Sequence, residues 1–442
     1  MGIAKTRKTA FDILLAVCEE GGKSHLQLTD AFARHPEFTA KDRAVITQLV
    51  HGTIEELRLI DWRIGEVSKL PVVKMKPKVR CALRLGFYQL LFLDRTSDAA
   101  AISDSVELVR KAGYEGLTRF VNGVLRAASV KTNWNEPPEA VKAGLPDALW
   151  ERFVRNLGKE RTLRMAEALR GRNPLTLRVN LSRTLPEEAV RLLAEDGWNA
   201  EVSVLPEALA LTRAEAAVPL EKTKVIREGL AAVQDLSGIL AVRLAAPKKG
   251  DKVLDLCAAP GGKALHAADL IGESGSVLAC DLSEKKVRLL AENVARCGFK
   301  NVLTRQADAL VFVPENECAF DLVIADLPCS GLGVMGRKPE IRFRVGGDEI
   351  RSLAALQRRI LRNAVRYVRP GGRLLYSTCT VTKEENQDNA AWLKDELGLV
   401  PAHIEDAVPD AFAGCAAGNC LQLLPSALSD GFFISVWEKE NE

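Results

Sequence analysis

The sequence has few aromatic residues, little net charge and no long apolar segment. Phe, Trp and Tyr make up 5% of the 442 residues, so a large base-stacking platform for nucleic acid is not expected. The net charge is only +3, and binding to a polyanion therefore has to be argued from local clusters of Lys and Arg. The apolar stretch Phe11 to Val17 is short and contains Asp12, which argues against a signal peptide or a membrane span.

The sequence also lacks the cysteine spacing of a disulfide-rich or metal-binding protein. Its ten cysteines are scattered along the chain, which favours a reducing, cytoplasmic location. Cys415 and Cys420 are close together but have no nearby histidine and no second pair, so no metal is expected. The composition, 47% hydrophobic and 27% charged, is that of a globular protein long enough for several domains. We expect no membrane association and a monomer.

Hydrophobic periodicity divides the chain into three regions. Residues 1–132 are predicted to form a helical bundle, with Thr39 and Asp42 as a capping pair for one helix. The polar, proline-bearing stretch 132–138 is a candidate linker. Residues 140–235 mix helices and short strands, and 184–187 is expected to be a capping box with Pro186 in the first turn. This middle region indicates a small α+β connector module.

Residues 236–442 alternate strands and helices. Apolar strands are predicted near 253–257, 276–280, 321–325 and 373–377, a pattern typical of a parallel sheet with both faces covered. The run 431–437 is expected to be a late strand, at the edge or antiparallel.

A glycine-containing turn follows the first of these strands. In open α/β sheets the ligand binds at the carboxyl ends of the strands, where the backbone must approach it closely, and Gly261 and Gly262 allow that approach within the turn 257–263. The turn lacks the dinucleotide fingerprint G-x-G-x-x-G. It also has Cys257 and Ala264 where a phosphate-binding P-loop needs Gly and Ser or Thr. Both phosphate-binding interpretations therefore fail.

Acidic residues are predicted at the ends of the next three strands. Asp281, Asp308 and Asp326 occupy these positions, although any one of them is about as easily an ordinary loop cap. Carboxylates suit ribose hydroxyls, an exocyclic amine and a cationic sulfonium, and they would repel a pyrophosphate. The pattern favours S-adenosylmethionine as the cofactor.

Cys329 and Cys379 each follow a predicted strand end on the cofactor side. C5 of cytosine is a poor nucleophile, but addition of a thiolate to C6 makes C5 enamine-like and able to accept a methyl group. One cysteine would attack, and its release would need assistance. Asp326 could protonate or hydrogen-bond the N3 edge of the ring. The alternative for either thiol is a small buried hydrophobe, and we prefer that interpretation for most other cysteines.

Three segments resemble a known family: 255–263 (DLCAAPGGK), 326–331 (DLPCSG) and 377–379 (STC). They are similar to the signature segments of the RsmB (Sun/Fmu) family of bacterial 16S rRNA cytosine-C5 methyltransferases, and the first 132 residues resemble the NusB-type RNA-binding bundle of that family. The resemblance covers nearly the whole chain. One departure is Leu327, where relatives often carry Pro or Ala.

The resemblance implies a multi-domain fold and specific roles for the motif residues. The expected parts are an all-α NusB-like bundle (1–132), a small α+β connector module (140–235) and an α/β Rossmann-like class I methyltransferase domain (236–442). Cys379 is implied as nucleophile and Cys329 as the residue that assists release. The residues implied to bind S-adenosylmethionine are Cys257, Ala258, Ala259, Pro260, Gly261, Gly262, Lys263, Asp281, Asp308 and Asp326.

Local basic clusters are candidates for RNA contact, because phosphate neutralisation needs such clusters when the total charge is nearly balanced. Each could instead be a solvated helix face. The clusters are 69–84 (Lys69, Lys74, Lys76, Lys78, Arg80, Arg84), 337–344 (Arg337, Lys338, Arg342, Arg344) and 358–369 (Arg358, Arg362, Arg366, Arg369).

The sequence thus predicts an enzyme that methylates C5 of a cytosine in 16S rRNA. Two alternatives remain open at this point. The same chemistry could act on tRNA or another RNA, or the chain could be a non-catalytic NusB-type RNA-binding factor with a degenerate cofactor domain.

Overall fold

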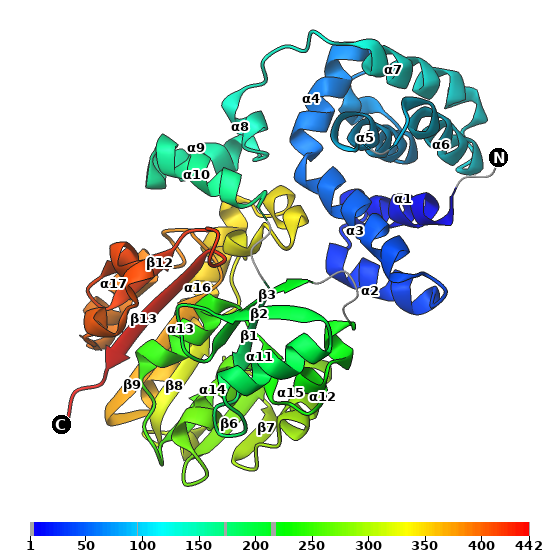
Figure 1. Ribbon diagram of the computed structural model, residues 1–442. Coiled ribbons are helices and arrows are strands. Elements are labelled where there is room, and N and C mark those ends of the chain that lie inside the picture. Colours follow the sequence, from blue (N-terminus) through cyan, green and yellow to red (C-terminus); the bar gives the residue numbers. More distant parts are fainter. Residues whose placement is uncertain (1–3, 95, 172–174, 214–217, 442) are drawn as a thin grey trace. The chain divides into compact units, whose positions relative to one another are not determined.

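The computed structural model describes residues 4–94, 96–171, 175–213 and 218–441. The chain forms two compact units (Figure 1). The first comprises Met1–Arg170 together with Met335–Arg344, and the second comprises Gly171–Val334 and Val345–Glu442. The three-part division expected from the sequence stays a prediction.

The first unit is helical, as the sequence predicts. Its helices are α1 (Lys5–Cys18), α2 (Ser24–Arg34), α3 (Ala40–Glu55), α4 (Leu57–Val67), α5 (Pro77–Phe92), α6 (Asp98–Lys111), α7 (Thr118–Val130), α8 (Glu139–Lys142), α9 (Asp147–Leu157) and α10 (Lys159–Ala168). Apolar residues of α1 to α7 form one core. Thr39 and Asp42 cap α3 reciprocally, which confirms the predicted capping pair.

The stretch 131–138 contains neither helix nor strand, and it lies within the first unit. Its role as a linker between domains stays a prediction. The stretch is fixed to α4. Arg63 lies over the ring of Trp134 and donates a hydrogen bond to the Asn135 carbonyl, and Glu66 accepts one from the Asn135 amide.

A short segment from late in the sequence completes the first unit. The chain enters this unit at Met335 and leaves it after Arg344. The buried Glu340 carboxylate accepts hydrogen bonds from the Ser24 amide at 2.9 Å and the Ser24 hydroxyl at 2.8 Å. Arg344 donates to the carbonyls of Val17 and Gly22. This segment therefore supplies polar partners for the end of α1 and the start of α2.

The second unit begins with a small antiparallel sheet of order β2-β3-β1-β4. Its strands are β1 (Leu175–Val179), β2 (Trp198–Val202), β3 (Ala208–Arg213) and β4 (Ala231–Val233), and its helices are α11 (Pro186–Glu195) and α12 (Lys224–Arg227). The predicted capping box at 184–187 is wrong. The Thr184 amide is bonded to the Asn180 carbonyl, so Thr184 still belongs to the preceding turn, and Leu185 precedes the helix. Pro186 opens the first turn of α11, as expected.

A larger sheet of order β11-β12-β13-β9-β8-β5-β6-β7 forms the rest of the second unit, with β10 paired to β13. Its strands are β5 (Lys252–Asp255), β6 (Ser276–Asp281), β7 (Val302–Gln306), β8 (Phe320–Asp326), β9 (Val368–Thr378), β10 (Val400–Pro401), β11 (Ala416–Ala417), β12 (Cys420–Leu423) and β13 (Phe432–Glu438). The five strands from β5 to β9 are parallel, as predicted. The late strand β13 is antiparallel, but it lies between β9 and β12 and not at the edge. The sheet is therefore mixed.

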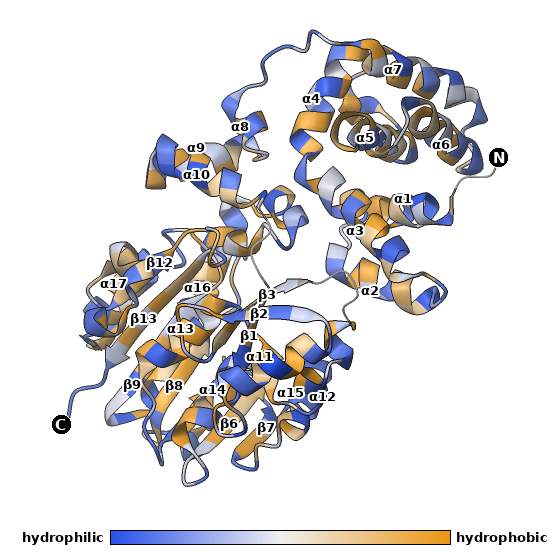
Figure 2. Cartoon of the chain, in the orientation of Figure 1, coloured by the Kyte–Doolittle hydropathy of each residue, from blue (hydrophilic) through white to orange (hydrophobic). Residues whose placement is uncertain are grey.

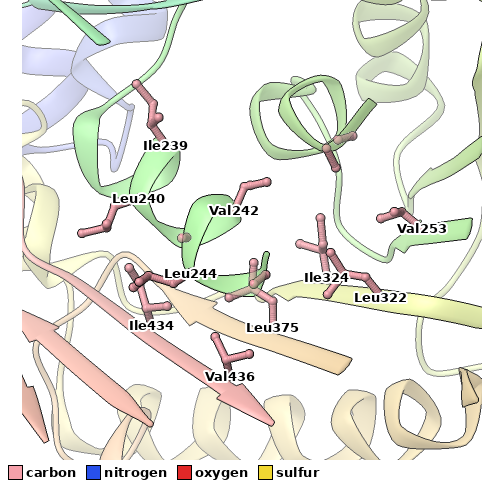
Figure 3. Packing of buried hydrophobic residues seen from close by; sticks show 14 of the residues in the cluster. Ile239, Leu240, Val242, Leu244, Val253, Leu322, Ile324, Leu375, Ile434 and Val436 are labelled. Carbon is pink, nitrogen blue, oxygen red and sulfur yellow. The ribbon is translucent and has the colours of Figure 1, made fainter. Parts of the chain in front are cut away.

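Helices cover both faces of this sheet. They are α13 (Leu236–Ala245), α14 (Gly262–Ile271), α15 (Glu284–Cys297), α16 (Gly347–Tyr367) and α17 (Gln387–Leu397). On one face α13 packs against alternate residues of the central strands, among them Leu322, Leu375 and Ile434 (Figure 3). On the other face α16 and α17 pack against the intervening residues, such as Val323, Leu374 and Phe433. Figure 2 shows the largely apolar central strands that this double cover requires.

Among the residues described, no helix combines the length and the apolar character needed to cross a membrane.

Candidate functional site

A cavity of about 280 Å³ lies at the carboxyl ends of β5, β8 and β9 in the second unit. The segment that joins β4 to α13 and the start of β13 complete its wall. The lining residues are Val233, Gln234, Asp235, Ser237, Gly238, Asp255, Cys257, Ala258, Ala259, Pro260, Gly262, Lys263, Asp326, Val334, Cys379, Asp430 and Phe432. Its position is the one expected for a ligand site in an α/β sheet.

The turn between β5 and α14 forms one wall of the cavity. Gly261 adopts a φ of 118°, and a Cβ at this position would lie 2.8 Å from the Leu290 side chain. The positive φ favours glycine here, and a side chain would also press on Leu290 of α15. The Ala258 amide donates to the Cys280 carbonyl at the end of β6, at 2.7 Å. Because α14 starts at Gly262, its first amides lie at the cavity.

Four aspartates and one lysine line the cavity, and among them Asp255, Asp326 and Lys263 affect one another's charge. Burial raises the pKa of Asp255 to about 7, and the negative charge of Asp326 adds to the shift. Lys263 donates to Asp326 Oδ2 at 2.6 Å, and Ser377 donates to Asp326 Oδ1 at 2.8 Å. Burial alone would lower the pKa of Lys263, but the contact with Asp326 outweighs it and raises that pKa. The Lys263 ammonium also lies 5.0 Å from the centre of the Phe432 ring.

The two predicted cysteines meet beside the cavity. Cys329 Sγ and Cys379 Sγ are 3.2 Å apart, which is far longer than a disulfide bond. Contact with Cys379 and burial raise the pKa of the Cys329 thiol well above its ordinary value. Cys379 lines the cavity, whereas Cys329 is not one of the lining residues. Two thiols thus lie together where a ligand base and a methyl donor could both reach one of them.

Not every predicted site residue lies at the cavity wall. The turn from Cys257 to Lys263, Asp326 and Cys379 come together there, with Gly261 behind the wall. Of the residues that the structure describes, Asp281 and Asp308 are not part of the lining. They stand at adjacent strand ends, where the Ala307 amide donates to the Asp281 carbonyl. Each carboxylate accepts a backbone amide two residues further on, Ser283 for Asp281 and Leu310 for Asp308.

Several lining residues were not singled out from the sequence. Asp255 is the last residue of β5, and its position before the glycine turn was a usable signal. Gln234 and Asp235 were assigned only to a domain boundary, although they lie at the wall. Asp430 and Phe432 come from the approach to β13, and no local motif marks them.

The predicted basic clusters are only partly available for RNA. Arg342 is 2% exposed and donates to the carbonyls of Gly144 and Met335, and Arg344 is bonded to the end of α1 and the loop that follows it. Both serve the packing of the first unit. The assignment to an RNA surface is wrong for the buried Arg342, and it stays a prediction for the half-buried Arg344.

Salt bridges engage arginines in the other two clusters. Arg80 and Arg84 pair with Glu19, and Arg84 also pairs with Asp61. Arg366 pairs with Glu317, and Arg369 pairs with Asp321. Lys69, Lys74 and Lys76 remain exposed.

In the described ranges, no group of three or more His, Cys, Asp or Glu side chains is arranged to hold a metal ion.

The mixed sheet, with its glycine turn after β5 and antiparallel β13, is the fold of an S-adenosylmethionine-dependent methyltransferase. Three family models match the chain. They are the 16S rRNA methyltransferase RsmB/F (242–438), the NusB family (4–129) and the ferredoxin-like domain of RsmF/B-like methyltransferases (145–218). The chain belongs to the ribosomal RNA small subunit methyltransferase B family. This confirms the resemblance and the fold class expected from the sequence.

Individual relatives support this assignment over nearly the full length. The probable ribosomal RNA small subunit methyltransferase B of Bacillus subtilis is 32% identical, with 98% of each chain covered. Ribosomal RNA small subunit methyltransferase B of Cronobacter sakazakii is 31% identical, covering 89% of this chain and 90% of that protein. Among solved structures, PH0851 is 28% identical with a TM-score of 0.81, covering 99% of this chain and 100% of the other. A methyltransferase homolog from Pyrococcus horikoshii is 27% identical with a TM-score of 0.59, covering 68% and 97%.

The buried Asp255 predicts a specific pH dependence of stability. Its pKa is about 7 in the folded protein against an ordinary value of 3.8, so the folded chain holds a proton that the unfolded chain releases between these values. The contribution of Asp255 to the free energy of unfolding therefore falls as the pH rises, by about 2–3 kcal/mol between pH 5 and pH 8. Asp255→Asn should remove this loss.

The measurement is urea unfolding of wild type and Asp255→Asn without added cofactor, at several pH values. Other groups titrate in the same range, such as His266, whose pKa burial lowers to about 4, but they contribute to both proteins and cancel in the difference. The variant should gain stability relative to wild type as the pH rises. A difference that is independent of pH would show that Asp255 is ionised throughout.

Proposed function

We propose that this protein methylates C5 of a cytosine in 16S rRNA, with S-adenosylmethionine as methyl donor. The observation that carries the proposal is the 3.2 Å separation of Cys329 Sγ and Cys379 Sγ beside the cavity. A second thiol at this distance has no use in methylation of an exocyclic amine or a ribose hydroxyl. It suits a reaction in which one cysteine adds to the base and must later be expelled.

The cavity has the features that a cationic, nucleoside-containing donor needs. We assign S-adenosylmethionine binding to Cys257, Ala258, Ala259, Pro260, Gly261, Gly262, Lys263, Asp281, Asp308 and Asp326. Asp255 joins this set, because a cationic ligand would relieve the cost of ionising its buried carboxyl. The lateral bonds from Ala258 to Cys280 and from Ala307 to Asp281 align the three strand ends along which an extended nucleoside would lie.

The chemistry assigned to the protein's own residues runs in three steps. The Cys379 thiolate adds to C6 of the cytosine, and negative charge develops on the ring. Asp326 in its protonated form hydrogen-bonds N3 or gives N3 its proton, which neutralises this charge. S-adenosylmethionine supplies the methyl group to C5. The C5 proton then passes to solvent, its bonding electrons re-form the C5–C6 double bond, and the C6–S bond breaks so that Cys379 departs as the thiolate with assistance from Cys329. A proton held on N3 returns to Asp326.

The rRNA substrate is inferred from the family and from the first unit. The curated relatives named above are ribosomal RNA small subunit methyltransferases, and residues 4–129 match the NusB family. In that unit Lys69, Lys74 and Lys76 are exposed within one short stretch, which suits phosphate contact. We assign them to RNA binding, in a cytoplasmic enzyme that acts as a monomer.

The reaction product and the identity of the nucleophile can be tested together. Wild type incubated with unmodified 16S rRNA and labelled S-adenosylmethionine should yield 5-methylcytosine, identified by nucleoside analysis. Because Cys379 forms the covalent bond, Cys379→Ala should lower kcat by at least about a thousandfold and leave cofactor affinity nearly unchanged. Cys415→Ala is the matched control, since Cys415 is exposed and outside the cavity lining. A methylated base other than cytosine, or label entering tRNA in preference, would refute the substrate assignment.

The role of Cys329 in releasing Cys379 from the methylated base can be tested separately. Cys329→Ala keeps the attacking thiol but removes the group assigned to expulsion, so a protein–RNA adduct should accumulate and appear as a slow band on a denaturing gel. The double change Cys329→Ala with Cys379→Ala should give no such band. If Cys379→Ala alone traps RNA instead, the roles of the two cysteines are reversed.

A further inference from the structure

A buried polar network lies beside the two loops that carry the cysteines, and its side chains are not among those that line the cavity. Its centre is the carboxylate of Glu385, which is 0% exposed. The carboxylate accepts four hydrogen bonds, which is the full capacity of its lone pairs. Donors to Oε1 are the Ser330 amide at 2.8 Å and Gln357 Nε2 at 3.1 Å, and donors to Oε2 are the hydroxyls of Ser330 and Thr382, both at 2.6 Å.

These bonds join the two cysteine-bearing loops. Ser330 directly follows Cys329, and Thr382 lies three residues beyond Cys379. The Ser330 hydroxyl is also 2.7 Å from that of Thr380, the residue next to Cys379. Gln357 of α16 donates to the Pro328 carbonyl as well as to Glu385. The loop that carries Cys329 is therefore held on both sides of the thiol, by Pro328 and by Ser330.

The bonds occur where the sheet no longer fixes the chain. The pairing of β8 with β9 ends at Asp326 and Ser377, followed by one backbone bond from Leu327 to Ser377. Beyond that point β8 and β9 are no longer paired with each other, although Thr378 still pairs with Phe433 of β13. A backbone bond from Gly333 to the Cys379 carbonyl ties the two loops again further on. Between these two backbone bonds, the hydrogen bonds to Glu385 and the contact between the Ser330 and Thr380 hydroxyls join the two loops.

We propose that Glu385 is a positioning residue for release: through Ser330 it holds Cys329 against Cys379, so that the covalent intermediate is resolved and does not persist. This inference rests on the proposed function and extends it. A carboxylate is the side chain that serves here, because only an acceptor with two oxygens and no proton receives all four donors. Its negative charge also contributes to the raised pKa of the Cys329 thiol, which keeps that cysteine from competing as nucleophile.

The test is Glu385→Gln in the full-length chain. Glutamine has the same shape, but its amide nitrogen accepts nothing, so the donors to one oxygen lose their partner. The Cys329 loop should loosen while Cys379 still attacks. We expect kcat to fall by about ten- to a hundredfold, with KM for S-adenosylmethionine unchanged within about twofold, and a protein–RNA adduct to accumulate although both cysteines are present. Loss of structure alone would give no adduct.

Asp388→Asn is the matched control. It removes the same charge three residues further on, where the carboxylate pairs with the exposed Lys383, and it should behave as wild type. Ser330→Ala provides a second route, because it removes the hydroxyl shared by Glu385 and Thr380 but keeps the backbone amide. Ser330→Ala should trap the same adduct, and it tests the positioning role of the network if Glu385→Gln does not fold.

The outcomes separate this inference from the proposed function. If wild type forms no 5-methylcytosine, the proposed function fails. If wild type is active and Cys329→Ala traps RNA, but folded Glu385→Gln shows full turnover or loses turnover without an adduct, the role assigned to Glu385 is overturned alone.

Discussion

The site depends on the parallel pairing of β8 with β9. After an irregularity between Phe320 and Leu322, the register places Asp326 opposite Ser377, and the two side chains are joined by a hydrogen bond of 2.8 Å. The strands therefore end at the same level. Cys329 and Cys379 follow these ends closely, and so two residues fifty positions apart come within 3.2 Å. A shift of one residue in this register would turn one of the strand-end side chains to the opposite face. Asp326 and Ser377 would then no longer meet, and the two cysteines would no longer lie together.

The second constraint is the charge held in the cavity. The negative charge of Asp326 adds to the raised pKa of Asp255, and Lys263 is the amine bonded to Asp326. A buried carboxyl whose pKa is raised to about 7 costs stability at neutral pH. Such a cost is common at functional sites, where groups are arranged for a ligand and not for the stability of the protein alone. Helices pack on both faces of the sheet, and the two apolar cores that they form stabilise the fold against this cost.

The sequence predicts those parts of the fold that depend on residues close together in the chain. The parallel strands, the glycine turn and Asp326 at a strand end follow from apolar runs that stop at polar residues. Local patterns fail where a contact joins distant segments. Arg342 and Arg344 look like members of a basic cluster, yet they are bonded to carbonyls of residues 17, 22 and 144. Likewise, nothing near Glu385 in the sequence indicates that its carboxylate accepts a hydrogen bond from Ser330, 55 residues earlier. Thr184 matched a capping pattern but lies one residue too early, because the preceding turn uses its amide.

The surroundings of the two thiols differ in a way that fits a division of labour. Cys379 is at the cavity wall, next to Asp326 and Lys263, where a base could reach it. Cys329 is not part of that wall in the described chain, and contact with Cys379, burial, Glu385 and Asp326 all disfavour its ionised form. A nucleophile must ionise and face the substrate, whereas a residue that acts on an adduct already formed needs only proximity and a fixed position. Cys379 faces the cavity, as the proposed nucleophile must. The hydrogen bonds of Glu385 to Ser330 hold the loop of Cys329, as the proposed role in release requires.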